Sequence, residues 1–149
     1  MPASLPPSLT FYTVVGDTET LTELLDFGTG DAIDADAELG PVRVRIYNGT
    51  DVATALNPIC YVGGTDASVV GEPDKEWIYI KNIDNNGVPV IDDPYEPISH
   101  LGTHTYKPLA GSDIAPETYI TFDTTLTVPV DTPGGRYEWD YIIEYMYTT

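Results

Sequence analysis

In "YEWDYIIEYMY", residues 137–147, large side chains alternate with acidic and smaller ones, and this pattern is the clearest indication of the fold. One face carries Tyr137, Trp139, Tyr141, Ile143, Tyr145 and Tyr147, and the other carries Glu138, Asp140, Ile142, Glu144 and Met146. A period of two residues is typical of a β-strand, and a buried aromatic side chain removes roughly 150–250 Å² from water. We therefore expect a strand whose aromatic face packs against a second sheet or another subunit.

The same alternation recurs along most of the chain. In 42–48, Val42, Val44 and Ile46 alternate with two arginines and a tyrosine, as in a half-buried strand. Strands are predicted at 9–15, 22–27, 42–48, 53–62, 76–82, 118–130 and 137–147. The stretch 17–27 leaves room for a helical turn or two, but its threonines favour a strand at least as much.

Turn signals separate these segments. Asn48-Gly49 accepts the positive φ values of a tight turn and predicts a hairpin that joins 42–48 to 53–62. "DNNG" (84–87) and "DTPGG" (131–135) predict further turns. Short strands joined by such turns predict an all-β fold, an immunoglobulin-like antiparallel β-sandwich.

A chain of 149 residues has the usual size of one domain. We expect a proline-rich N-terminal arm at 1–8 and a single sandwich domain at 9–149, with a loop-rich region at 63–117. The N-terminal stretch has neither the basic nor the long apolar part of a secretory signal, and no apolar run reaches the roughly 20 residues of a membrane span. We therefore expect a soluble protein.

A net charge of −18 is the strongest anomaly of the composition. A field of that sign repels phosphates, so the composition argues against direct contact with nucleic acid or an anionic membrane. Aspartates outnumber glutamates 15 to 9, and lysines are few. This balance resembles that of proteins adapted to high salt, where screening relieves self-repulsion, although an ordinary acidic surface is an equally open explanation.

An acidic run precedes the strand at 42–48 and holds Asp31, Asp34, Asp36 and Glu38. Carboxylates are ligands for Ca²⁺, which makes these four residues weak calcium candidates. The run is not an EF-hand loop, because its sixth position from Asp31 lacks glycine and its twelfth lacks glutamate. We expect an acidic, solvent-exposed link between strands.

Other motifs for chemistry are weak. "HLGTH" places His100 and His104 four residues apart, but Gly102 and flanking prolines oppose a helix, so we expect no zinc site. Cys60 is the only cysteine and is predicted to lie in the core. No nucleophile elbow or phosphate-binding loop is present, and we expect no catalytic or cofactor-binding residues and no enzymatic activity.

Two segments resemble a known family. "LLDFGTGDAIDADAELGPVRVRIYNGTDVATALNPICYV" (24–62) resembles the opening of small immunoglobulin-like domains in head and tail proteins of tailed viruses, where an F-G turn and a short acidic or glycine-rich link lead into a valine-rich strand. "LTVPVDTPGGRYEWDYIIEYMY" (126–147) is similar to their closing half, with a Val-Pro step, a glycine turn and a long aromatic strand. The resemblance implies a virion structural protein, and the composition suggests a virus of a salt-loving host.

From this resemblance we expect a capsid decoration (cement) subunit located in the virion, or alternatively a small tail or baseplate protein. Expected partners are the major capsid protein or other virion proteins, and a homo-oligomer, a trimer or a higher ring. The interaction residues expected are Pro6 and Pro7 in the arm and Tyr145 and Tyr147 at the C-terminal strand.

A carbohydrate-binding module is a further alternative, with an aromatic platform formed by Trp77, Tyr79 or Trp139. A binding module is usually tethered to a longer chain. This chain starts at Met1 and ends two residues after its last expected strand, which we take to favour the structural subunit.

Overall fold

The computed structural model describes residues 5–100, 105–109 and 113–148, and its two sheets pair their strands antiparallel. The seven-stranded sheet has the order β2 (Thr18–Leu21), β1 (Leu9–Val15), β3 (Ala37–Asn48), β9 (Tyr119–Val128), β5 (Ile78–Asn85), with β6 (Val88–Pro89) and β7 (Glu96–Ile98) both paired to β5. The three-stranded sheet has the order β10 (Asp140–Met146), β4 (Leu56–Gly63), β8 (Lys107–Pro108), and one helical turn, α1 (Ala67–Val70), follows β4. The fold is all-β, as expected.

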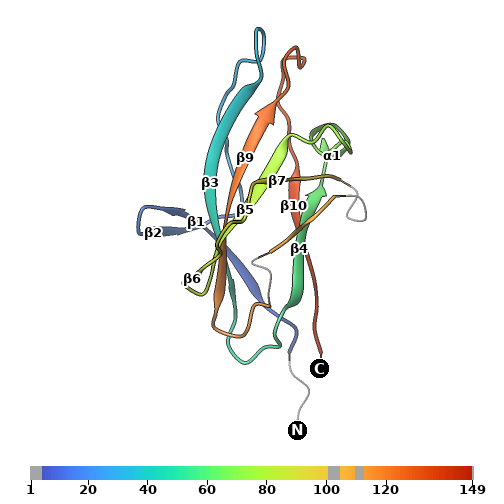
Figure 1. Ribbon diagram of the computed structural model, residues 1–149. Coiled ribbons are helices and arrows are strands. Elements are labelled where there is room, and N and C mark those ends of the chain that lie inside the picture. The colour runs from blue at the N-terminus through green and yellow to red at the C-terminus, as the bar shows by residue number, and fades with distance from the viewer. Residues whose placement is uncertain (1–4, 101–104, 110–112, 149) are drawn as a thin grey trace.

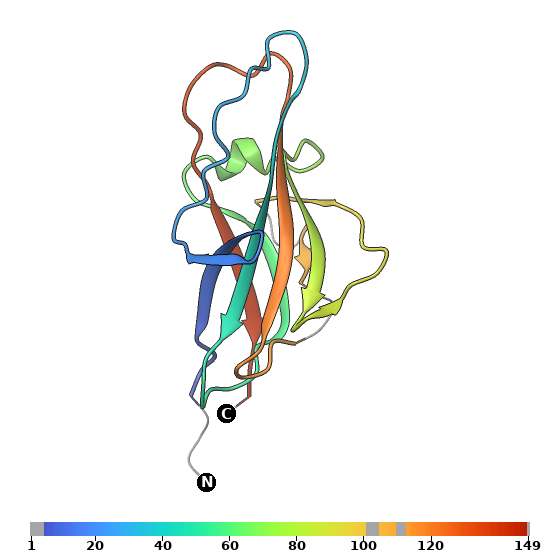
Figure 2. The same ribbon diagram turned by 90° about the vertical axis from the view of Figure 1, so that its left-hand side faces the viewer.

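The two sheets form two layers around one core. Figure 1 shows β10 and β4 to one side of β3, β9 and β5, and in Figure 2, turned by 90°, they lie behind the larger sheet. The core joins Ile46 and Phe122 of the larger sheet to Cys60 and Val62 of the smaller one. This arrangement is consistent with a β-sandwich.

The C-terminal strand is confirmed as the anchor of the smaller sheet. Its large side chains from Tyr137 to Tyr145 pack against the core, whereas Tyr147 is 41% exposed. The strand begins three residues later than predicted, at Asp140, because the segment before it turns back toward α1, where Glu138 donates its backbone N–H to Asp66.

The alternating strand at 42–48 is also confirmed, and it is longer than predicted. β3 starts at Ala37, and its pairing with β9 shifts register between Leu39 and Val42. Gly40 lies in this irregularity with φ +91°, and a Cβ there would be 3.0 Å from the Thr124 carbonyl oxygen. Glycine is therefore required on both counts.

The predicted hairpin at Asn48-Gly49 is wrong. β3 pairs with β1 and β9, whereas β4 pairs with β10 and β8, so the link between β3 and β4 crosses from one sheet to the other. In this link the positive φ falls on Asp51, at 57°, and not on the pair that a tight turn requires. Asn48 is instead buried, and its side-chain amide bonds to backbone groups on both sides of the crossing.

The strand predicted at 22–27 is misplaced, and no helical turn forms at 17–27. β2 covers residues 18–21 and forms a hairpin with β1 around Gly16, whose φ is +60°. Residues 22–27 leave the sheet, and Leu25 and Phe27 pack on the core. Apolar residues in this segment thus serve to cover the core without joining a strand ladder.

The region 63–117 contains more regular structure than a loop-rich segment suggests. It contributes β5, which lies inside the larger sheet between β9 and the short strands β6 and β7. The predicted "DNNG" turn is confirmed, since Asn86 (φ 49°) and Gly87 (φ 85°) connect β5 to β6. Two positive φ values in succession are those of the type I′ turn.

Candidate functional site

An open apolar groove lies where the smaller sheet fails to cover the larger one. Phe11 of β1 pairs with Ile46 of β3 and shares its inward face, yet Phe11 is 38% exposed and Ile46 is fully buried. The groove runs from Phe11 to Tyr141 and Ile143 of β10, under the segment 22–33. An inward aromatic side chain that remains exposed marks a part of the sandwich without a second layer.

The segment that covers the groove is fixed to the smaller sheet by aromatic packing. Phe27 stacks on Trp139 with ring centroids 5.8 Å apart and an interplanar angle of 28°. Leu24 is 77% exposed, and Ile33 is 72% exposed. Both line the groove, so apolar surface continues from its interior to its rim.

The strand β10 borders the groove with an unpaired edge. It pairs with β4 on one side, and within the described part of the chain no strand pairs with its other side. Val62, opposite Tyr141, donates its backbone N–H to Ser99 on the side away from β10. In an antiparallel pair both backbone groups of a residue point to the same side. Tyr141, and Ile143 two residues later, therefore direct N–H and C=O outward from the sheet.

Tyr141 fixes this edge to the larger sheet. Its hydroxyl lies 2.6 Å from Oγ1 of Thr124, which is fully buried on β9. Burial raises the pKa of the Tyr141 phenol above its ordinary value. The edge strand is thereby held in place by a buried polar contact as well as by apolar packing.

The groove is lined by negative charge. Six carboxylates lie along it, those of Glu23, Asp26, Asp31, Asp131, Glu138 and Asp140. Arg136 is the one cation of the lining, and it pairs with Glu138 at 2.8 Å. The site therefore combines an apolar interior with an acidic rim.

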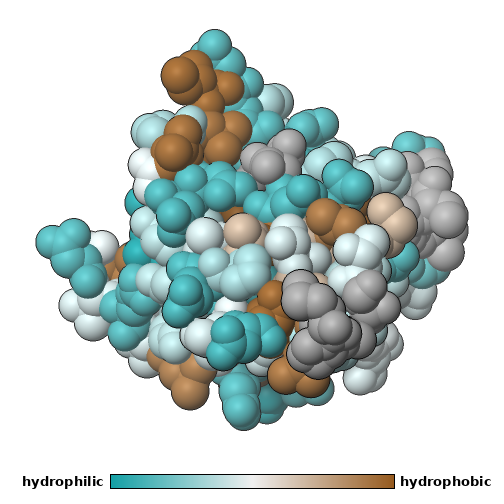
Figure 3. Space-filling model, turned by 90° about the horizontal axis from the view of Figure 1, so that it is seen from below, coloured by the Kyte–Doolittle hydropathy of each residue, from teal (hydrophilic) through white to brown (hydrophobic). Residues whose placement is uncertain are grey.

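A second surface lies at the end of the molecule where the described chain begins and ends (Figures 1 and 2). Leu5 and Met146 are each 62% exposed, and Tyr147 is 41% exposed. Viewed from this end, hydrophobic patches are separated by hydrophilic surface (Figure 3). Tyr145 differs from Tyr147 in being partly buried against the core.

The N-terminal arm, as far as it is described, contacts its own chain. Leu5 accepts a hydrogen bond from the Ala53 N–H at 2.7 Å, and Ser8 donates its N–H to Oδ1 of Asn48 at 3.0 Å. Pro6 is exposed, whereas Pro7 is buried. Pro6 is therefore accessible to a partner, whereas Pro7 is not. Residues 1–4 lie outside the described part of the chain.

The acidic run is exposed: Asp31, Asp34 and Asp36 lie in the link before β3, and Glu38 lies in β3 itself. Two of its carboxylates accept hydrogen bonds from backbone N–H groups of this chain. Asp36 accepts the Val130 N–H at 2.8 Å, and Asp31 accepts the Ile33 N–H at 3.1 Å. Asp34 and Glu38 are exposed. Among the described residues no group of three or more His, Cys, Asp or Glu side chains could hold a metal ion. The structure thus does not bring the four calcium candidates together.

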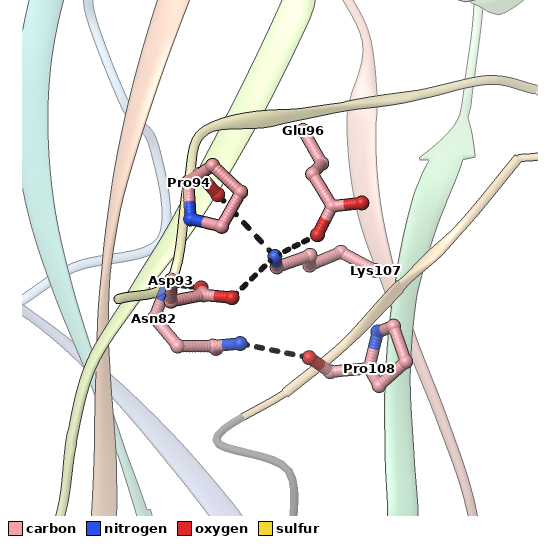
Figure 4. Close-up of polar contacts among 6 residues, drawn as sticks. All are labelled: Asn82, Asp93, Pro94, Glu96, Lys107 and Pro108. Carbon is pink, nitrogen blue, oxygen red and sulfur yellow. Dashed lines mark hydrogen bonds and ion pairs between the residues drawn. The ribbon is translucent and has the colours of Figure 1, made fainter. Parts of the chain in front are cut away.

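A buried lysine escaped the sequence analysis. Lys107 is 3% exposed, and its amino group contacts Oδ1 of Asp93 at 2.8 Å, a carboxylate oxygen of Glu96 and the carbonyl of Pro94 (Figure 4). These ion pairs raise the Lys107 pKa even though burial opposes the charged form. The three donors of the ammonium group are all occupied, which indicates a structural clamp between β8 and residues 93–96, which lead into β7. The signal in the sequence was the acidic, proline-rich stretch 92–97.

The remaining residues considered in the sequence analysis do not form a site among the described residues. Cys60 is fully buried, and burial raises the pKa of its thiol. His100 is half-buried, and His104 lies outside the described residues. Trp77 is buried, so it offers no free face to a sugar, and Trp139 is covered by Phe27.

Comparison with protein-family models, with curated proteins and with solved structures finds no match for this chain. Among the described residues no helix has the length and apolar character needed to cross a membrane.

Proposed function

We propose that this protein is a non-enzymatic structural subunit of a virion, and in particular a capsid decoration (cement) protein of a tailed virus. The observation that carries the proposal is the exposure of three large apolar side chains, Leu5, Met146 and Tyr147, near the end where the described chain begins and ends. Exposed apolar side chains at one end of a strongly acidic protein suggest a contact with another protein, even though hydrophilic surface separates them. The resemblance of 24–62 and 126–147 to small virion domains supplies the viral context.

We also propose that the sandwich has an immunoglobulin-like topology. It is supported by two antiparallel layers of unequal width and by a long C-terminal strand that joins the smaller one. A small tail or baseplate subunit with the same fold is the alternative role. The proposed partners are the major capsid protein or other virion proteins, together with further copies of this chain.

Self-association is the first test. We expect the full chain to form a trimer or a higher ring in size-exclusion chromatography with light scattering at molar NaCl, where charge repulsion is screened. Replacement of Leu5, Met146 and Tyr147 by Ser should yield monomers, because it removes apolar area from the proposed contact.

The matched control replaces Val88 and Ile91, which are 68% and 80% exposed at the far edge of the larger sheet, by Ser. It should assemble like the wild type. A wild-type protein that stays monomeric at high concentration in molar salt would contradict the oligomer, and assembly that the control abolishes equally would contradict the proposed surface.

The arm is tested by deletion of residues 1–4, which spares the hydrogen bonds made by Leu5 and Ser8. Unfolding free energy should stay near the wild-type value, while assembly or attachment to capsids should weaken. A truncated protein that assembles as well as the full chain would remove the arm from the contact. Deletion of residues 1–8 is a poorer test, because it also breaks the Ser8 bond to Asn48.

A further inference from the structure

We propose that the outer edge of β10 accepts an extended strand from a different protein, with apolar and basic side chains alternating along that strand. This inference adds a second protein partner to the proposed structural role. It rests on that role only in assuming that this chain binds another protein. It concerns the groove between β1 and β10, and not the surface near the termini.

The backbone of β10 offers a place for one more strand. Tyr141 and Ile143 direct two N–H and two C=O groups away from β4, and a strand laid alongside would pair with all four. Such addition of a strand to an open sheet edge is a recurrent way to bind an extended peptide. The regular register between Asp140 and Glu144 gives this edge the length of five residues.

The inward side chains of the added strand must be apolar. Residues opposite Tyr141 and Ile143 would share their face and point into the groove. There they would meet Phe11, whose ring is 38% exposed on the inner face of the larger sheet. A fourth strand in the smaller sheet would thus complete the second layer over β1.

The outward side chains of the added strand must be basic. On the outer face of β10, Asp140 and Glu144 are exposed and stand four residues apart. Cross-strand neighbours have Cβ atoms about 4.5–5.5 Å apart, close enough for ion pairs. Five further carboxylates line the groove against one arginine that is already paired. A basic strand is therefore favoured, and an acidic one is opposed.

A second copy of this chain does not fit these requirements. Its net charge is −18, and its own β10 edge would set Asp140 and Glu144 against like charges. Acidic residues on an open edge also protect against self-pairing. The occupant is for this reason a chain of a different protein.

The test uses a seven-residue peptide of alternating valine and arginine, the length of β10, with blocked ends. Binding to the full chain is measured by calorimetry near 0.15 M salt, where the screening length is about 8 Å. The first comparison peptide has glutamate in place of arginine. The second has the same composition with its residues in blocks, so that it carries the same charge without the alternation.

We expect the alternating basic peptide to bind at least about tenfold more tightly than either comparison peptide. On binding, amide hydrogen exchange at Tyr141 and Ile143 should slow at least about tenfold, because their N–H groups become paired. If the second comparison peptide, whose valines and arginines are grouped, binds as tightly as the alternating peptide, general charge attraction explains the binding and the proposal is overturned. Unchanged exchange at these two amides would overturn it as well.

Charge reversal at the edge supplies the matched variants. Asp140→Lys with Glu144→Lys should weaken binding of the basic peptide at least about tenfold and create binding of the acidic one. Asp17→Lys with Glu72→Lys changes the net charge equally at exposed positions outside the β10 edge and should alter binding less than about twofold. Equal losses in the two variants would contradict the site.

The two proposals fail in different ways. A protein that forms a ring but ignores the peptide overturns the strand addition alone, whereas a monomer that binds the peptide overturns the oligomer alone. Protection of the Tyr141 and Ile143 amides that grows with protein concentration and without peptide would assign the edge to a second copy and refute a foreign strand.

Discussion

Replacement of Asn48 by Ala is the sharpest test of how the two sheets are joined. Oδ1 of Asn48 accepts the N–H groups of Ser8 and Gly49, and Nδ2 donates to the carbonyls of Ala53 and Ile114, each at 2.9 Å. The residue is 3% exposed, so water cannot readily replace these partners. In the variant, Ile114 keeps the hydrogen bond from the Ala55 N–H, and the half-buried Gly49 can reach solvent.

The cost follows from the groups that lose their partner. Ser8 is exposed, so its N–H can be hydrated as well. The carbonyl of the buried Ala53 remains, and an unsatisfied buried polar group costs about 1–3 kcal/mol. A protein of this size changes its melting temperature by about 2–4 °C per kcal/mol, so we expect a fall of roughly 2–12 °C. The loss is measurable against a typical total stability of about 5–15 kcal/mol.

The assay is urea unfolding followed by tryptophan fluorescence, with the free energy of unfolding extrapolated to water. The control is Asn85→Ala, which removes one hydrogen bond, from Nδ2 to the Asp113 carbonyl at 3.2 Å, and should cost about 1 kcal/mol or less. If Asn48→Ala is no more destabilising than the control, the amide does not hold the crossing between the sheets.

Four further predictions concern the charged and buried groups. Lys107→Met should cost about 3–5 kcal/mol in urea unfolding, because Asp93, whose side chain is 17% exposed, loses its cation, whereas Glu96 is 55% exposed and can be hydrated; a cost below about 1 kcal/mol would contradict this. Hydrogen bonds from Arg45 and Tyr47 lower the pKa of Glu19 in the folded protein. The charged Glu19 should therefore stabilise the fold by at most about 1 kcal/mol. This contribution should be complete above the ordinary pKa of 4.5 and should disappear as the pH falls through the lower folded pKa. The difference in unfolding free energy between wild type and Glu19→Gln across that range measures it, and a difference that grows on acidification would refute it. Removal of salt should lower the melting temperature, since the net charge is −18, and equal values in molar and millimolar NaCl would refute adaptation to high salt. Cys60 should react with a thiol reagent only at the rate of unfolding, and rapid labelling of the native protein would show that it is accessible.

Strands whose pattern is local could be predicted from the sequence. The alternation in 42–48 and 137–147 specifies both a strand and its buried face, and the structure confirms both, although the second strand covers only Asp140–Met146. The pairing of strands was not predictable in the same way. Asn48-Gly49 has the composition of a tight turn, but its conformation is set by hydrogen bonds to Ser8 and Ile114, which are distant along the chain.

The candidate site shows the same limit. Exposure of Tyr147 and burial of Cys60 follow from strand pattern and position, and both could be anticipated. The groove could not, because it depends on the different widths of two sheets, and sequence alone does not give those widths. The Lys107 clamp likewise joins β8 to residues 93–96, which lead into β7, and no spacing rule links them.

The position of β10 after all the other strands in the sequence governs the order in which the two sheets can fold. Ile143 pairs with Cys60, so the smaller sheet joins segments that are far apart in the sequence. Such distant pairing is slow, since a long loop must close before any contact is formed. During synthesis the larger sheet can assemble before β10 emerges, and the part of its inner face that β10 covers stays bare until then. A chain cut short before Asp140 would keep that face exposed and would be prone to aggregate.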